Sequence, residues 1–378
     1  MALRNPDKWS PSLLTSLQPI LRLLEDDKIT EIEVNGFNVI FVKGHGIRGH
    51  KRVENIGWRD LSDFTTACTR ISDVIQRRIN QERPRLDGRL PGGERVNIVI
   101  PPACELGSMT IRKFPAETMT MEKLLGYKSI NEDMAAMMKS LVLLKKSTLV
   151  AGGTGSGKTS LLNALSRLLP DHERVVTVED SRELQIQNQN WVALETVEPY
   201  KEGVPPVTIG DLVKNTLRQT PDRTIVGEVR GDEAFYLVRA LSTGHGGGFG
   251  TIHANGGREA LRQLQILAQM APVGGLDGML VAEMVGNAID AVLYASYDED
   301  TEERRVSEIL EVNKPGALIL PNGQAIYSVR HLVVWDEDKL EWVYRDRPSP
   351  KLLRTIQRRK LPWPEKSLLA PEPLPEAA

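Results

Sequence analysis

Eight consecutive residues have the composition of a loop that binds phosphate groups. They are Gly152-Gly153-Thr154-Gly155-Ser156-Gly157-Lys158-Thr159, and Ser160 follows them. Glycines allow successive backbone N–H groups to turn toward one anion, and a helix that begins after the loop adds its positive end. In such a loop Lys158 reaches the β- and γ-phosphates of a nucleotide, and the hydroxyl of Thr159 binds Mg²⁺. We therefore predict that residues 152–160 bind a nucleotide with Mg²⁺.

The residues on either side of this loop predict the elements that it needs. Ser147–Ala151 is a short apolar run typical of a buried strand, and Lys158–Leu169 has leucines on one helical face before Pro170. This order of strand, loop and helix makes a merely flexible glycine-rich loop a poor alternative. The loop alone still leaves a kinase, a GTPase, a helicase or a motor open.

A nucleotide-hydrolysing site also needs acidic groups near the phosphates. Two apolar segments end in such groups: Arg174–Asp180 contains Glu179, and Thr224–Gly231 contains Glu228. In open α/β sheets, ligands gather at the carboxyl ends of strands, so we expect both acids to lie near Lys158. Without the phosphate-binding loop, an acid at a strand end would more often be a solvated cap.

A glycine-rich segment with two histidines follows at residues 243–255. Its composition predicts a mobile loop and then a strand that passes close to a ligand. His253 is as well suited to sensing the γ-phosphate as to a structural role, and His245 is less suited to contacting nucleotide. No cysteine and no His-x-x-x-His pair accompanies them, so the segment does not predict a zinc site.

The composition is that of a globular protein without a charge bias. The chain has 378 residues, of which 40% are hydrophobic, with 48 lysines and arginines against 50 aspartates and glutamates. This length predicts two or three domains. A dedicated nucleic-acid-binding protein usually has a basic excess, so we expect no direct binding to nucleic acid. Cys68 and Cys104 form no Cys-x-x-Cys pair, which excludes a zinc knuckle built from them.

The sequence also indicates the cellular compartment of the protein. The N-terminal residues are polar, without the apolar core of a signal peptide. No apolar run approaches the roughly 20 residues that a membrane-spanning helix needs. We therefore expect a cytoplasmic protein that can still dock on a membrane complex.

Residues 1–115 have the pattern of a small α+β domain. Alternating apolar residues interrupted by Asn35-Gly36 predict a hairpin over residues 29–42. Apolar residues at spacings of three and four then predict a helix over residues 61–79 that buries Cys68 in its apolar face. Two further strands are predicted, at residues 95–100 and 109–114.

The rest of the chain predicts a larger α/β domain. Residues 116–130 are expected to be a linker, and residues 131–330 repeat strand, turn and helix in the manner of a sheet covered by helices. Residues 331–378 hold a predicted terminal hairpin and a proline-rich tail, which we expect to be mostly extended or disordered. Its basic segment, Arg354–Lys360, is expected to be a solvated face.

Four motifs in a fixed order make the sequence resemble the type II/type IV secretion ATPase superfamily, the traffic ATPases of secretion, conjugation and pilus machines. They are a Walker A loop at 152–159, an aspartate box at 176–186, a Walker B stretch at 217–231 and a histidine box at 243–255. The resemblance implies a C-terminal RecA-like P-loop NTPase domain after a smaller α+β N-terminal domain. It is strongest to the type IV secretion and conjugal transfer branch, with similarity to tight-adherence pilus ATPases.

The resemblance implies roles for the candidate residues of the second domain. Glu179 would be the catalytic glutamate that polarises the attacking water. Glu228 would be the Walker B acid that supports Mg²⁺, together with Thr159. His253 would couple the nucleotide state to the domain interface. The substrate would be ATP.

From the first domain, the resemblance implies an arginine that brings positive charge to the phosphates. The matching residue is Arg112, with Arg89 and Arg95 as alternatives. A guanidinium there would stabilise the charge that develops on the γ-phosphoryl oxygens in the transition state. Members of the superfamily form hexameric rings that bind ATP between their N- and C-terminal domains.

The predicted function is therefore a homohexameric ATPase that powers transport of substrate or pilin by a type IV secretion or conjugation machine. Its expected partners are inner-membrane proteins of that machine, with peripheral membrane association. A pilus assembly ATPase of the same superfamily is the alternative. A RecA-like nucleic-acid motor is disfavoured by the balanced charge, and an inactive assembly protein by the intact residues Lys158, Thr159, Glu179 and Glu228.

Overall fold

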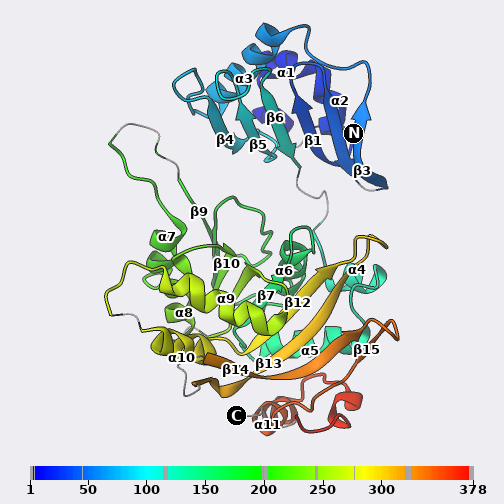
Figure 1. Ribbon diagram of the computed structural model, residues 1–378, viewed down its shortest axis with the longest axis vertical. Coiled ribbons are helices and arrows are strands. Elements are labelled where there is room, and N and C mark those ends of the chain that lie inside the picture. The colour runs from blue at the N-terminus through cyan, green and yellow to red at the C-terminus, as the bar shows by residue number, and fades with distance from the viewer. Residues whose placement is uncertain are drawn as a thin grey trace. The chain divides into compact units, whose positions relative to one another are not determined.

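The computed structural model describes residues 3, 5–44, 46–113, 118–197, 199, 203–242, 246–275, 277–319 and 325–373. The chain divides into two compact units, Met1–Glu117 and Thr118–Ala378 (Figure 1). Each unit has its own sheet and its own buried core. Within the described residues, no helix combines the length and the apolar character that crossing a membrane requires.

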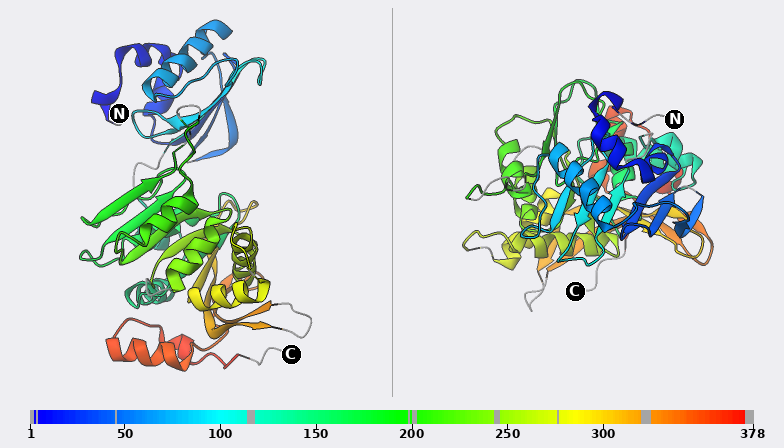
Figure 2. Two further views of the ribbon diagram at one scale, coloured as in Figure 1. Left: turned by 90° about the vertical axis from the view of Figure 1, so that its left-hand side faces the viewer. Right: turned by 90° about the horizontal axis from the view of Figure 1, so that it is seen from above.

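The first unit is built on an antiparallel sheet of six strands. They are β1 (Ile29–Asn35), β2 (Ile40–Gly44), β3 (Ile47–Val53), β4 (Arg85–Arg89), β5 (Arg95–Val99) and β6 (Ser108–Arg112). The helical segments are η1 (Pro6–Lys8), α1 (Pro11–Ser16), η2 (Gln18–Ile20), α2 (Leu21–Glu25) and α3 (Leu61–Val74). The strand order is β3-β2-β1-β6-β5-β4, and helices α1 and α3 pack together against this sheet (Figure 2).

Apolar and polar side chains alternate along the strands, so this sheet has one apolar face. In β6, Met109 and Ile111 are buried whereas Thr110 between them is exposed, because successive side chains point to opposite faces. The buried face joins Phe64 and Cys68 of α3 in one core. Burial raises the pKa of the Cys68 thiol to about 12. The predicted core role of Cys68 is thereby confirmed, as is the predicted antiparallel hairpin of β1 and β2.

The second unit is built on a nine-stranded sheet. Its strands are β7 (Thr148–Gly152), β8 (Val175–Glu179), β9 (Trp191–Glu195), β10 (Arg223–Val229), β11 (Phe249–His253), β12 (Ala291–Tyr297), β13 (Arg304–Ile319), β14 (Ala325–Asp336) and β15 (Glu341–Val343). Its helical segments are α4 (Met121–Gly126), α5 (Glu132–Leu143), α6 (Lys158–Ser166), α7 (Ile209–Thr216), α8 (Glu233–Ser242), α9 (Gly257–Gln269), α10 (Gly278–Ala288), α11 (Pro350–Arg359) and η3 (Glu365–Leu368).

The strands of this sheet follow the order β15-β14-β13-β12-β7-β11-β10-β8-β9. Strands β7 to β12 pair in parallel, and β13, β14 and β15 extend the sheet in antiparallel pairs. The carboxyl ends of the parallel strands therefore share one edge. Together with the smaller first unit, this sheet confirms the predicted α/β fold class.

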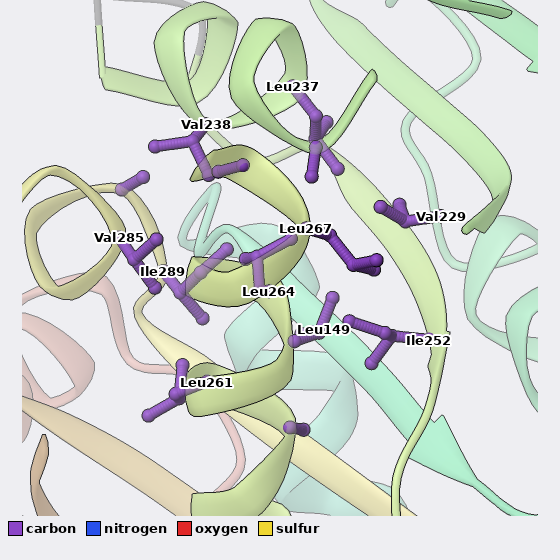
Figure 3. Close-up of a cluster of buried hydrophobic side chains, with 14 of the residues drawn as sticks. Leu149, Val229, Leu237, Val238, Ile252, Leu261, Leu264, Leu267, Val285 and Ile289 are labelled. Carbon is purple, nitrogen blue, oxygen red and sulfur yellow. The ribbon is translucent and has the colours of Figure 1, made fainter. Parts of the chain in front are cut away.

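Helices cover both faces of the large sheet. Leu149 and Ala151 of β7 belong to the core beneath α8, α9 and α10, whereas Val150 between them belongs to the core beneath α5 and α6. Figure 3 shows the first of these cores, in which Leu149, Val229 and Ile252 of three strands meet side chains of the helices. Burial on both faces explains why the central strands are continuous apolar runs in the sequence.

The structure differs from the prediction at two supposed boundaries. Helix α4 lies inside the stretch 116–130 that we expected to be a linker, and its Met121 and Leu124 are buried in the core. Six residues are too short a helix for periodicity to reveal it. At the other boundary, β14 crosses residue 330 and pairs with β13 along its length, so the predicted hairpin of β14 and β15 belongs to the main sheet.

The described part of the proline-rich tail is folded, contrary to the prediction that the tail is mostly extended or disordered. Helix α11 begins at Pro350, where proline is tolerated because a first-turn N–H has no helical partner. It buries Leu352 and Ile356, which lie one turn apart. The arginines and the lysine of Arg354–Lys360 are exposed, as predicted for a solvated face. Residues 374–378 of the tail lie outside the described residues.

Candidate active site

The phosphate-binding loop lies where β7 ends and α6 begins. Gly157 precedes the first residue of α6 with a φ of 93°, a conformation that favours glycine. Gly152 leaves no room for a side chain, because an added Cβ would lie 2.2 Å from the carbonyl oxygen of Ala295 in β12. Thr159 and Ser160 lie in the first turn of α6, and Thr154 is exposed in the loop. The predicted strand, loop and helix are thus confirmed.

The side chain of Lys158 lies across this loop. Its Nζ donates hydrogen bonds to the carbonyl oxygens of Gly152 at 3.0 Å and of Gly153 at 2.7 Å. Burial lowers the pKa of Lys158, an effect that Glu228 opposes and Arg230 reinforces. A glycine-rich cradle around a largely buried ammonium fits the phosphate groups of a nucleotide.

Glu179 is the last residue of β8 and is buried. Its Oε1 accepts hydrogen bonds from the backbone N–H groups of Glu183 at 2.7 Å and of Leu184 at 2.9 Å. The aspartate box therefore turns back on its own glutamate. The neighbouring strand β10 approaches closely, because a Cβ on Gly227 would lie 2.8 Å from the Cγ of Glu179. Glycine before Glu228 is what allows the two strand ends to pack together.

Two cationic side chains and one imidazole lie near the carboxylate of Glu228. Arg230 donates a hydrogen bond to its Oε2, and Nε2 of His253 lies 2.8 Å from its Oε1. Burial alone would raise the pKa of Glu228, but Arg230, His253 and Lys158 outweigh it and lower the pKa. Glu228 is therefore ionised at neutral pH. As predicted, this acid and Lys158 lie at the same edge of the sheet.

The two halves of the histidine box lie at opposite edges of the sheet. His253 ends β11 and pairs in register with Gly152, the first glycine of the phosphate-binding loop. The glycines Gly247 and Gly248 precede β11 at the other edge, where Arg223 donates a hydrogen bond to the carbonyl oxygen of Gly247. The strand that we predicted to pass close to a ligand is thus β11, whose end lies beside the phosphate-binding loop, whereas Gly247 and Gly248 lie at the opposite edge of the sheet. Thr243, Gly244 and His245 lie outside the described residues.

Arg112 belongs to the first unit. It donates a hydrogen bond from Nε to Oε1 of Glu31 at 3.0 Å and is exposed. Arg95 pairs in register with Arg112, and Arg89 pairs in register with Arg95. The three candidate arginines therefore form one row across β4, β5 and β6 on the face opposite the core. Within the described residues of the second unit, Lys158 lies at the same edge of the sheet as the ends of β8, β10 and β11.

Sequence reasoning missed two arginines beside the site. Arg230 stood next to a predicted acid, but its bond to Glu228 depends on how β10 ends. Arg304 lies 149 positions after Gly155 and donates a hydrogen bond from Nε to the carbonyl oxygen of that glycine at 2.7 Å. No local pattern in the sequence connects these two residues.

The two predicted Mg²⁺ ligands, Thr159 and Glu228, come from α6 and β10. Among the described residues, no three His, Cys, Asp or Glu side chains come together as a metal site. A hydroxyl and one ionised carboxylate beside a phosphate cradle fit an ion that takes its remaining ligands from phosphate and water.

Comparisons with known proteins agree with this geometry. Residues 14–294 match the family described as type II/IV secretion system protein. The chain is 39% identical over 291 residues to the type IV secretion system protein PtlH of Bordetella pertussis, covering 84% of it with 71% of this chain. It is 32% identical over 314 residues to the conjugal transfer protein TrbB of Rhizobium radiobacter, covering 91% of it with 80% of this chain.

A longer relative and a solved structure complete the comparison. This chain is 40% identical over 232 residues to an uncharacterized protein of Methanocaldococcus jannaschii. The match covers 59% of this chain and 32% of that protein. The ATPase DotB of Legionella pneumophila has the same fold, with a TM-score of 0.54 at 17% identity over 91% of this chain and 87% of DotB. The family match spans most of both units, and two relatives above 30% identity are covered over 84% and 91% of their lengths. The chain therefore belongs to the type II/IV secretion system protein family, in the group of VirB11-like type IV secretion and conjugation ATPases.

Proposed function

We propose that this protein hydrolyses ATP to ADP and phosphate, and that hydrolysis powers a type IV secretion or conjugation machine. The observation that supports this best is one constellation at the carboxyl edge of a single sheet. It consists of a buried ammonium, Lys158, in a phosphate-binding loop and two carboxylates, Glu179 and Glu228, at the ends of adjacent strands. Phosphoryl transfer needs positioning and charge stabilisation, and these groups supply both.

In this proposal each side chain has a separate task. The Lys158 ammonium exchanges the carbonyl groups of its loop for phosphate oxygens. Glu179 polarises the water whose oxygen bonds to the γ-phosphorus as the bond to the ADP oxygen breaks. Its Oε1 is fixed by two backbone N–H groups, so the carboxylate keeps one orientation during the reaction.

Glu228 is suited to a cation because its own environment keeps it ionised. In the proposal, Thr159 and Glu228 hold Mg²⁺, which when bound neutralises charge on the phosphate oxygens. His253 would sense the γ-phosphate through Glu228, since its Nε2 lies 2.8 Å from that carboxylate. A change at the phosphates would then reach the start of α9, which follows His253 by four residues.

The assembly is proposed from the family. A homohexamer would bind ATP between N- and C-terminal domains, with Arg112 supplying positive charge from the first unit. Its partners would be inner-membrane proteins of a secretion machine, with the ring on the cytoplasmic side and peripheral at the membrane. The names of PtlH and TrbB favour secretion or conjugation. A pilus assembly ATPase of the same family is the second candidate.

The substitution Glu179→Gln tests the proposal. Glutamine keeps an oxygen that can accept the bonds from Glu183 and Leu184, so the fold and nucleotide affinity should persist. Turnover should fall by about 10²- to 10⁴-fold, the usual contribution of a group that activates water. Phosphate release and ADP affinity would be measured on the same preparation.

The matched control is Asp171→Asn, an exposed acid before the opposite end of β8, which should keep full turnover. Full turnover in the Glu179→Gln variant would move the catalytic role to another residue. A second arm adds single-stranded DNA to the wild-type protein. Strong stimulation with directional unwinding would replace the secretion proposal by a nucleic-acid motor.

A further inference from the structure

The hairpin of β12 and β13 places an aromatic ring and a guanidinium beside the phosphate-binding loop. Tyr297 ends β12 and pairs in register with Arg304, the first residue of β13. The guanidinium carbon of Arg304 lies over the Tyr297 ring, 4.5 Å from its centre. Nε of the same guanidinium donates a hydrogen bond to the carbonyl oxygen of Gly155 at 2.7 Å. Arg304 is therefore fixed both to the ring and to the loop.

The order of the strands says which part of a nucleotide would meet this pair. From β7, where the loop begins, the strands β11, β10 and β8 lie on one side, and they bring Glu228 and Glu179. A γ-phosphate must face these acids for hydrolysis. The opposite end of the triphosphate, which carries the nucleoside, then leaves the loop on the other side. That side is formed by β12 and β13, and β12 touches the loop where Ala295 meets Gly152.

The chemistry of the pair suits a flat, uncharged ring system. A guanidinium is planar and stacks on aromatic faces, and arginine planes stack against nucleic-acid bases in the same way. The Arg304 guanidinium carbon lies over the Tyr297 ring, and Arg304 is exposed to solvent, so a ligand can reach the guanidinium. The Cδ of Arg304 also lies 3.7 Å from the place that a Cβ on Gly157 would take, at the start of α6.

We propose that Arg304, backed by Tyr297, is the surface on which the base of the bound nucleotide stacks. The inference rests on the proposed nucleotide site and adds its nucleoside-binding half. Stacking on a guanidinium needs no hydrogen-bond pattern on the base, so adenine and guanine nucleotides should depend on Arg304 alike. Phosphate chains without a base should not depend on it.

The test compares two ligands, ADP and inorganic tripolyphosphate, by calorimetric titration of the full chain. In Arg304→Gln, ADP should bind about tenfold or more weakly, because one stacked base is lost. Tripolyphosphate should bind as in the wild type. Tyr297→Ala should also weaken ADP binding, because the guanidinium of Arg304 loses its contact with the aromatic ring. The control is Tyr236→Ala, which breaks a similar contact with Lys214 in α7 and should leave both ligands unaffected.

A lysine variant separates stacking from charge. Arg304→Lys keeps the positive charge and a hydrogen-bond donor for Gly155, but an ammonium is not planar and cannot stack on a base. ADP should therefore bind this variant as weakly as it binds Arg304→Gln. ADP binding of normal affinity in Arg304→Lys would overturn the inference. An equal loss of affinity for ADP and for tripolyphosphate in Arg304→Gln would also overturn it, because it would indicate that Arg304 positions the loop. Failure of the wild type to bind either ligand would instead refute the nucleotide site itself, and the inference with it.

Discussion

At the scale of single residues, the charged groups of the site are held by contacts within the protein. Lys158 lies on two carbonyl oxygens, and Glu228 accepts a hydrogen bond from Arg230. A nucleotide with its cation would compete for both groups. The energetic cost of binding is therefore the exchange of these contacts, and the gain is a stronger pairing of full charges.

Replacing Lys158 by alanine should weaken nucleotide binding without unfolding the protein. The ammonium is the main positive charge within the cradle, and charged hydrogen bonds of this kind correspond to about a tenfold to hundredfold change in affinity. ADP affinity, measured by titration, is the observable. Lys139→Ala, at an exposed position of α5, is the control and should leave the affinity unchanged. An unaltered affinity in Lys158→Ala would remove the loop from the proposed site.

At the scale of the elements, one buried ion pair joins four segments at the edge of the sheet away from the site. Arg223, the first residue of β10, is fully buried, and its Nε donates to Oε2 of Glu173 at 2.6 Å. The same guanidinium donates to the carbonyl oxygens of Gly247 at 2.8 Å and of Val142 at 2.8 Å. The glycines before β11 thus leave room for Arg223, since a Cβ on Gly247 would lie 2.5 Å from its Nη1.

Arg223→Met should therefore destabilise the second unit strongly. Removing one partner leaves Glu173 buried, with Lys145 as its remaining cationic neighbour among the described residues, and such a loss costs about 3–5 kcal/mol. The shift of the urea midpoint measures it. The double variant Arg223→Met with Glu173→Leu should lose less than the sum of the single variants, because no unpaired charge remains. Additive losses would show that the two side chains do not interact energetically.

At the scale of the whole molecule, the first unit contributes a row of arginines. Arg89, Arg95 and Arg112 are consecutive partners across three strands, so the sheet presents them together on one face. Strand pairing brings together residues that stand up to 23 positions apart in the sequence. The family implies that one of them completes a nucleotide site in the hexamer.

Arg112→Ala should lower kcat in the assembled protein by about 10³-fold, the lower end of the effect of an arginine that stabilises transferring phosphate. Stability should change little, because the exposed pair with Glu31 contributes at most about 1 kcal/mol. Glu31→Ala is the matched control, since it breaks the same pair but keeps the guanidinium, and its turnover should persist. If Arg112→Ala hydrolyses ATP at the normal rate, Arg95→Ala and Arg89→Ala become the variants to measure.

The sequence by itself determined the features that depend on local chemistry. The glycine-rich loop, the strands that end in Glu179 and Glu228, the α/β class and the family all follow from neighbouring residues and their order. Backbone conformation and strand or helix periodicity are local properties, so they leave local patterns.

Only the tertiary structure decided what each of these groups touches. Arg304 contacts Gly155 because β12 and β13 lie beside β7, and no periodicity records a contact across 149 positions. The placement of Gly247 and Gly248 at the far edge of the sheet and the packing of α11 also depend on segments that are distant in the sequence. The packing of the whole core sets the strand order and decides which distant segments are buried against each other. The residues that surround a predicted site can therefore be identified only from the folded structure.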